Sequence, residues 1–140
     1  MRKFIIVKIR LLDAEHDLDG YLAVVHQVDR FPRSAAEWRE RQRPAGTDAF
    51  RRYLVGQLGD RIAAVAAVLD SNMAANGVVV RIVVDARLRG RGHGRAMAAT
   101  VDALLAGRVR EPDEIEVPVR DDDPISRAWA ERRGFACATT

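Results

Sequence analysis

The most informative run of the chain is Arg87-Leu88-Arg89-Gly90-Arg91-Gly92-His93-Gly94-Arg95. It separates an apolar segment typical of a strand, residues 78–84, from a segment with helical periodicity, residues 96–105. A glycine-rich turn that opens a helix presents unpaired backbone N–H groups and the positive end of the helix dipole, which together bind anions. The four arginines of the run add positive charge. We therefore predict a site for a phosphate or a pyrophosphate, as in a nucleotide-like ligand.

Other phosphate-binding motifs fit this run less well. A P-loop requires Gly-x-x-x-x-Gly-Lys-Ser/Thr, and no Lys-Ser or Lys-Thr pair follows the run. A dinucleotide-binding fold requires Gly-x-Gly-x-x-Gly near the start of a strand–helix–strand unit, whereas Gly90, Gly92 and Gly94 have a different spacing and lie late in the chain. A solvated arginine–glycine loop without a ligand is the remaining alternative.

Length and composition indicate a single domain over residues 1–140, because 48% apolar residues suffice for a core without disulfides. The net charge is +3 with acids and bases intermixed, which gives little support for a nucleic-acid partner. The single cysteine, Cys137, fits a reducing compartment. No run approaches the roughly 20 apolar residues of a membrane span. We expect a cytoplasmic protein that binds neither nucleic acid nor membrane.

Hydrophobic periodicity predicts an α/β (α+β) chain in the order β-α-α-β-β-β-α-β-α-β. Ser34 and Glu37 match a capping box at the start of the second helix. Gly59-Asp60 is typical of a hairpin turn, and Pro118 leaves one side of its strand unpaired. The predicted elements span residues 4–11, 18–28, a short helix after Ser34, 50–58, 61–69, 78–84, 96–105, 115–119, 124–133 and a stub within 136–140.

Two segments resemble the signatures of one family. Arg89-Gly90-Arg91-Gly92-His93-Gly94 is similar to the Arg/Gln-x-x-Gly-x-Gly/Ala signature of the GNAT superfamily of N-acetyltransferases. Residues 84–88 stand where that family often has Val-x-Pro-x-Tyr. Residues 123–135 are similar to its second signature, Asn-x-x-Ala-x-x-x-Tyr-x-x-x-Gly-Phe. The order of the predicted elements also agrees with this family.

The resemblance implies a mixed sheet with helices on both faces, whose fourth and fifth strands diverge to admit acyl-CoA. The pantetheine arm would pair with backbone near Val83 and Val84, and N–H groups of the turn would hold the pyrophosphate. The implied activity is transfer of an acetyl group from acetyl-CoA to a primary amine of a small molecule or peptide, without a metal. The cofactor-binding residues predicted on this basis are Val83, Val84, Arg89, Gly90, Arg91, Gly92, His93, Gly94, Arg95 and Asp123.

Departures from the family pattern concern the chemistry. The tyrosine that often protonates the departing thiolate aligns with Ala130. Asp123 replaces the usual asparagine, and it either binds the ligand or caps the last helix. Asp85, which ends the central strand, is the candidate general base, with a role as a turn residue as the alternative. A catalytically degenerate acyl-CoA-binding module within a larger tandem GNAT protein is therefore the alternative function.

Two further expectations concern partners. The resemblance places the acceptor near Phe31, Pro32, Arg33 and Trp38. The alternative, which is the commoner role of such residues, is that Phe31 and Trp38 belong to the core at helix ends. Few residues follow Phe135, too few for the last strands of the family, so we expect an open sheet edge. Because unpaired edges are normally covered, a second copy or another domain should pair with it. His26 is expected to be exposed, and His93 to orient the loop or touch phosphate.

Overall fold

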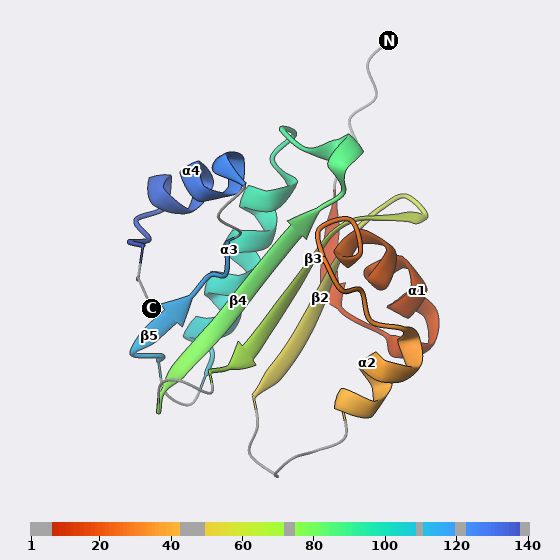
Figure 1. Cartoon of the computed structure of the whole chain (residues 1–140), viewed down its shortest axis with the longest axis horizontal. Helices are drawn as coiled ribbons and strands as arrows, with labels where there is room; N and C mark the ends of the chain where they lie inside the picture. The colour runs from red at the N-terminus through yellow and green to blue at the C-terminus, as the bar shows by residue number, and fades with distance from the viewer. Residues whose placement is uncertain (1–6, 43–49, 72–74, 109–110, 120–122, 138–140) are drawn as a thin grey trace.

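A five-stranded mixed sheet forms the centre of the computed structural model, which describes residues 7–42, 50–71, 75–108, 111–119 and 123–137 (Figure 1). The strands lie in sequence order across the sheet. The first four pair in antiparallel fashion, and the last pairs with its neighbour in parallel. The strands are β1 (Lys8–Leu11), β2 (Arg51–Leu58), β3 (Arg61–Asp70), β4 (Gly77–Val84) and β5 (Glu114–Glu116).

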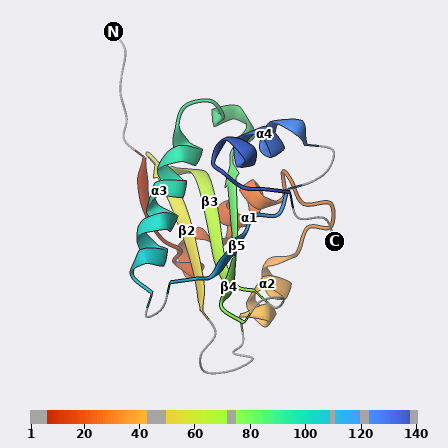
Figure 2. The same ribbon diagram turned by 90° about the vertical axis from the view of Figure 1, so that its left-hand side faces the viewer.

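Helices cover both faces of this sheet, as predicted (Figures 1 and 2). Helix α1 packs on one face together with α2, and α3 packs on the other. A short 3-10 helix, η1, joins β4 to the turn before α3. The helices are α1 (Ala14–Val25), α2 (Ala35–Arg41), η1 (Ala86–Leu88), α3 (His93–Ala106) and α4 (Pro124–Arg132). None of the helices in the described ranges is long and apolar enough to cross a membrane.

The core has two parts, one on each face of β3. On the α3 face, Met97, Val101 and Leu105 pack against alternate residues of the strands. On the α1 face, Leu18 and Leu22 belong to a second cluster that includes residues of β2, β3 and β4. Residues 63–68 of β3 are buried on both faces, which explains their continuous apolar sequence. This central strand and its two clusters fix β4, from which the candidate site is built.

The local signals in the sequence are confirmed at both helix and turn positions. Glu37 N–H donates to Ser34 Oγ at 3.1 Å, and Ser34 N–H donates to Glu37 Oε1 at 3.3 Å, which completes the predicted capping box. The hairpin between β2 and β3 turns at Gly59, whose φ of 65° favours glycine.

Several element boundaries differ from the prediction: helix α1 spans Ala14–Val25 rather than residues 18–28, and strand β1 begins at Lys8, since the described residue 7 is not in a strand. Helix α3 starts at His93 rather than at residue 96, because Gly92 takes the left-handed N-cap conformation that lets the chain enter the helix directly. Strand β5 is confined to Glu114–Glu116, because the chain stops pairing with β4 after Glu116, just before Pro118. Residues 4–6 and 138–140 lie outside the described residues, and residues 136 and 137 are not in a strand.

Candidate active site

β4 and β5 separate part-way along their length, and this opens a cleft. Their pairing begins at Gly77 with Glu114 and ends at Val79 with Glu116. β4 continues to Val84 with β3 as its partner. The predicted divergence of the fourth and fifth strands is therefore confirmed, and the backbone of β4 beyond Val79 has no strand beside it on the β5 side within the described chain.

The cleft has a volume of about 630 Å³. Its walls are β4, the glycine-rich turn with α3 as far as Leu105, β5 with the chain after it, and α4, and Val28 after α1 also lines it. Arg91, which was predicted to bind the cofactor, is exposed and does not line the cleft. The predicted cofactor residues that do line it are Val83, Val84, Arg89, Gly90, Gly92, His93, Gly94, Arg95 and Asp123.

The turn before α3 depends on backbone conformations that favour glycine. Gly90 and Gly92 have φ values of 78° and 86°. A Cβ at either position would meet nothing within 4 Å, so the dihedral angle and not crowding accounts for glycine there. The N-cap residue Gly92 provides no side-chain cap, and the first helical bond of this turn runs from Ala96 N–H to Gly92 C=O. The first N–H groups of α3 therefore have no acceptor within the helix, the arrangement that binds anions.

Cationic and polar side chains surround this helix terminus. Arg89 and Arg95 line the cleft, and Arg89 Nε lies 3.4 Å from Val84 C=O. His93 begins α3, and its buried Nε2 has no hydrogen-bond partner among the described residues. The arrangement offers positive charge and open N–H groups at one place, which suits a phosphate-bearing ligand.

Asp123 caps α4 at the wall of the cleft. Its carboxylate accepts from Ser126 N–H at 3.0 Å and from Ser126 Oγ–H at 2.6 Å. The Ser126 hydroxyl, with its backbone N–H and the charge of Arg89 as smaller contributions, lowers the pKa of Asp123. The capping interpretation is confirmed, while contact with a ligand stays a prediction. Ala130, at the position of the family's tyrosine, is buried and supplies no acidic group.

Asp85 lies outside the cleft. The residue is only 8% exposed, and it lines a separate hollow of about 410 Å³. The carboxylate accepts from Arg87 N–H at 2.9 Å and from Gln27 Nε2 at 3.4 Å. These bonds, the Arg87 N–H first, lower the pKa of Asp85 and make it a weaker base. The structure thus gives Asp85 the role of N-cap of η1, and its catalytic role stays a prediction.

The two aromatic residues of the predicted acceptor region lie in different environments. Trp38 packs with Tyr21 and Tyr53, with ring centroids 6.3 Å and 5.1 Å away, so its core interpretation is confirmed. Phe31 is 85% exposed, so the core interpretation is wrong for this residue. His26 is exposed as expected, and its Nε2 lies 2.7 Å from Arg33 C=O, which ties the segment to the end of α1.

One ion pair of the cleft was not anticipated from the sequence. Arg81, in the middle of β4, lines the cleft and pairs with Asp29, just after α1. The available signal was the lone charged residue within the otherwise apolar strand Gly77–Val84.

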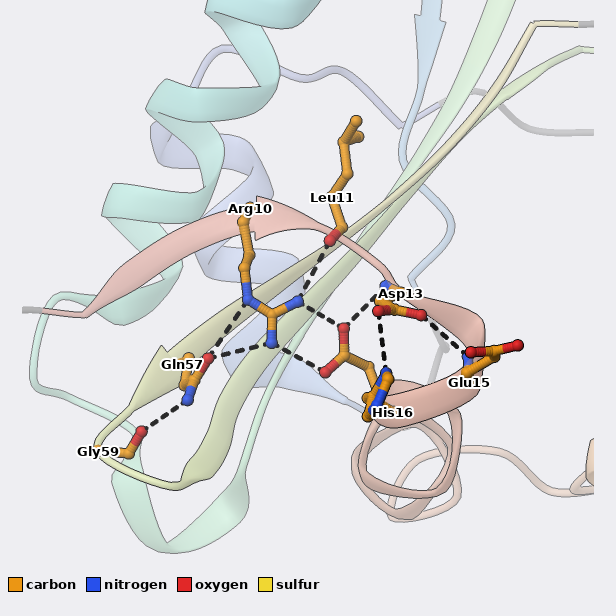
Figure 3. Close-up of polar contacts among 8 residues, drawn as sticks. Arg10, Leu11, Asp13, Glu15, His16, Gln57 and Gly59 are labelled. Carbon is orange, nitrogen blue, oxygen red and sulfur yellow. Dashed lines mark hydrogen bonds and ion pairs between the residues drawn. The ribbon is translucent and has the colours of Figure 1, made fainter.

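A polar network at the start of α1 lies in the separate hollow (Figure 3). Arg10 donates to both oxygens of Asp17 at 2.5 and 2.8 Å and also to Gln57 Oε1 at 3.0 Å. Asp13, Glu15 and His16 gather nearby, but all three are exposed. Asp13 caps α1 by accepting from Glu15 N–H at 3.1 Å, and its other carboxylate oxygen lies 3.0 Å from His16 Nδ1. The network ties α1 to β1 and β2.

Comparison with known proteins agrees with this geometry. The sequence matches the acetyltransferase (GNAT) family over residues 15–135. No curated protein matches the sequence at a significant level.

Among solved structures, the fold is similar to an aminoglycoside N-acetyltransferase in complex with CoA, with a TM-score of 0.77 and 14% identity over 100% of this chain and 94% of that chain. It is also similar to the ribosomal-protein-S18-alanine N-acetyltransferase of Escherichia coli, with a TM-score of 0.72 and 22% identity over 96% and 80% of the two chains. For the glucosamine-6-phosphate N-acetyltransferase of Arabidopsis thaliana, the TM-score is 0.67 and the identity 19%, over 96% and 94%. These structures share the fold, and the family match spans most of the sequence, so the chain belongs to the acetyltransferase (GNAT) family.

Proposed function

We propose that the protein transfers an acetyl group from acetyl-CoA to a primary amine of a small molecule or peptide. The observation that carries this proposal is the cleft between the diverging strands β4 and β5, which ends at the uncapped, glycine-rich start of α3. One end of the cleft suits a diphosphate, and its wall offers an unpaired strand edge. These are the two features that an extended phosphate-bearing thioester requires.

The residues present fit acetyl-CoA in a definite direction. The N–H groups of the first turn of α3, with Arg89 and Arg95, would hold the pyrophosphate. The amide-containing arm would lie along residues 80–84 and pair with the backbone of β4. The thioester would then reach the part of the cleft lined by Val83 and Arg81, opposite the segment after α1.

The reaction needs little from acidic side chains. The amine nitrogen attacks the thioester carbonyl carbon, a C–N bond forms, and the C–S bond breaks as the thiolate leaves. Because a thiol has a pKa of about 8.5, the thiolate can leave without protonation by the enzyme. The alanine at position 130 is therefore compatible with turnover. Backbone N–H groups of β4 can polarise the carbonyl, and positioning supplies the rest of the acceleration.

The amine must lose a proton before or during attack. Asp85 is the base proposed from the sequence, but its carboxylate lies in the separate hollow and would have to act through water. An amine that binds in its neutral form would need no base of this kind.

The second candidate function is an acyl-CoA-binding module without catalysis. The buried Ala130 in place of the family's tyrosine favours it. The two functions predict the same affinity for acetyl-CoA and differ only in the release of thiol in the presence of amines.

Calorimetry with acetyl-CoA and a thiol-release assay with a panel of amines test the proposal. We expect binding by the wild type and weaker binding by Arg89→Gln/Arg95→Gln, by at least tenfold. The control is Arg39→Gln/Arg61→Gln, which removes two exposed arginines outside the cleft and should leave the affinity unchanged. Equal affinity of the two double variants would contradict the phosphate site. Binding without thiol release on every amine would favour the non-catalytic module.

The sheet edge and the location of the protein also belong to this proposal. β5 is the edge strand of the described sheet, and Ile115 on it is exposed. We propose that a second copy or a further domain covers this edge, in a cytoplasmic protein. Light scattering of the purified chain would contradict self-pairing if it gave the mass of a monomer at all concentrations.

A further inference from the structure

Arg81 is the single charged residue of β4, whose sequence is otherwise glycine and aliphatic residues. In the register of the sheet, Arg81 pairs with Ala67, and Ala67 pairs with Tyr53. Directly paired residues project from the same face of a sheet. Tyr53 belongs to the cluster packed under α1, so Arg81 lies on the α1 face, with only the small Ala67 between them. The strand thus presents one cation on the face where the acceptor is expected.

The guanidinium of Arg81 is held by a single ion pair. Its Nη2 donates to Oδ1 of Asp29, which follows α1 and whose own N–H donates to Val25 C=O at 3.1 Å. The two side chains are 37% and 26% exposed. A guanidinium has five N–H donors, and that of Arg81 makes no other hydrogen bond or ion pair with the described residues. Most of its donors are therefore open, and the residue lines the cleft.

Arg81 lies close to the place of the reaction. It comes two residues before Val83 on the same strand and face, a separation of about 7 Å at roughly 3.3 Å per residue. A group bound at Arg81 and an amine at the thioester could therefore belong to one acceptor molecule, a few bonds apart. The arginine is thus placed to bind a substituent of the acceptor rather than the thioester.

The neighbouring charges favour an acidic substituent. The segment after α1 reads Asp29-Arg30-Phe31-Pro32-Arg33, and both of its arginines are exposed. Its one acid is already paired with Arg81, and that pair shows that the position accommodates a carboxylate. Arginine binds carboxylates through two parallel hydrogen bonds, which lysine cannot reproduce.

We propose that Arg81 binds a carboxylate on the acceptor, so that the substrates are amines that also carry a carboxylate, with Asp29 as the residue that positions Arg81. This inference rests on the proposed acetyl transfer. It assigns the selectivity for the acceptor to one side chain on the wall of the cleft opposite the phosphate end.

Amino acids and their primary amides test this proposal, because each pair differs in the carboxylate and keeps the amine. Thiol release from acetyl-CoA gives kcat and KM for both members of a pair, and calorimetry gives the affinity for acetyl-CoA. We expect the wild type to prefer the carboxylate in kcat/KM by at least tenfold. Arg81→Gln should abolish the preference mainly through KM, and Arg81→Lys should keep part of it. Both should bind acetyl-CoA as the wild type does.

Arg30→Gln is the matched control, since it removes an exposed arginine of the neighbouring segment and should retain the preference. Comparison among variants cancels the difference in amine basicity between an amino acid and its amide. The inference would be overturned by no preference in the wild type, by an unchanged preference in Arg81→Gln, or by acetylation only of amines that lack a carboxylate. Acetyl-CoA that binds while every carboxylate-bearing amine is refused also overturns it. Failure of the wild type to bind acetyl-CoA would instead refute the proposed function itself.

Discussion

The two ends of the cleft are built from different chemical parts of the chain. At the α3 end, the turn through Gly90 and Gly92 and the open N–H groups of the helix supply backbone binding groups, and Arg89 and Arg95 add positive charge to them. At the opposite end, the groups are side chains, Arg81 with Asp29, carried by two elements that are far apart in sequence. A backbone site recognises what all its ligands share, whereas a side-chain site can be changed without altering the fold. We infer that the first end serves the common thioester carrier and the second end the particular acceptor.

The largest expected effect tests whether a loss of stability at the acceptor end of the cleft changes the binding of acetyl-CoA at the α3 end. Helix α1 leads into the acceptor segment, and Arg10 holds it through the buried carboxylate of Asp17, which is 5% exposed. Asp17→Asn should lower the free energy of unfolding by about 2 kcal/mol, since breaking a buried ion pair costs about 3–5 kcal/mol and Arg10 is partly exposed. Urea denaturation measures this loss. The affinity of the folded variant for acetyl-CoA should stay unchanged.

The dependence of this loss on pH has a defined sign. The hydrogen bond from Arg10 lowers the pKa of Asp17 below its ordinary 3.8. The stabilisation is therefore present above that value and disappears as the pH falls through the lowered pKa. The difference between wild type and Asp17→Asn should shrink in acid. The control, Glu131→Gln, changes an exposed pair within α4 and should cost less than about 0.5 kcal/mol. A parallel loss of acetyl-CoA affinity in Asp17→Asn would show that the two ends are coupled.

The next effect tests how far the α3 end depends on backbone conformation. Gly92 and Gly59 both have positive φ, and a Cβ at either would meet nothing within 4 Å. Alanine at each position should therefore cost a similar free energy of unfolding, about 1–2 kcal/mol. Only Gly92→Ala should also weaken the binding of acetyl-CoA, by about tenfold. The reason is that a turn that changes its conformation to relieve this strain no longer presents its N–H groups to the phosphates. Thermal unfolding and calorimetry separate the two effects.

Gly59→Ala is the matched control because it has the same backbone strain in a hairpin outside the cleft. Wild-type affinity for acetyl-CoA in both variants would contradict a phosphate site that depends on the backbone conformation of this turn. A loss of affinity in both would indicate a general loss of structure.

The same contrast explains how much could be predicted from the sequence. The capping box at Ser34, the hairpin at Gly59 and the glycine turn are local backbone features, and residue type alone indicates them. The start of α3 was misplaced because Gly94 and Arg95 were assigned to the turn, although they lie in the first helical turn. The tertiary pairing of Arg81 with Asp29 joins residues 52 positions apart, which no local pattern predicts.

Asp85 shows the limit of prediction by position along the chain. Its place at the end of β4 put it next to the expected thioester, but the direction of its side chain was not in the sequence. The carboxylate turns toward Gln27 and Arg87, away from the cleft, where it caps η1. Ile115, Val117 and Val119 alternated as in a strand, yet only the first of them pairs with β4, because strand pairing is decided by the neighbour as well as the sequence.

The smallest expected effect concerns this residue and bears on the chemistry between the two ends. Asp85→Asn keeps a side-chain oxygen that can accept from Arg87 N–H, and asparagine is as good a cap as aspartate, so stability at neutral pH should change by less than about 0.5 kcal/mol. Because its pKa is lowered, the Asp85 carboxylate stabilises the fold above its ordinary 3.8 and loses that contribution as the pH falls through the lowered pKa. The variant should therefore lose less stability in acid than the wild type. Its kcat and the pH profile of kcat/KM should match the wild type, and Asp60→Asn, in the same hollow, should behave alike. A fall in kcat of about 10²–10⁴-fold in Asp85→Asn alone would instead establish Asp85 as the base and require a water path from the cleft to the hollow.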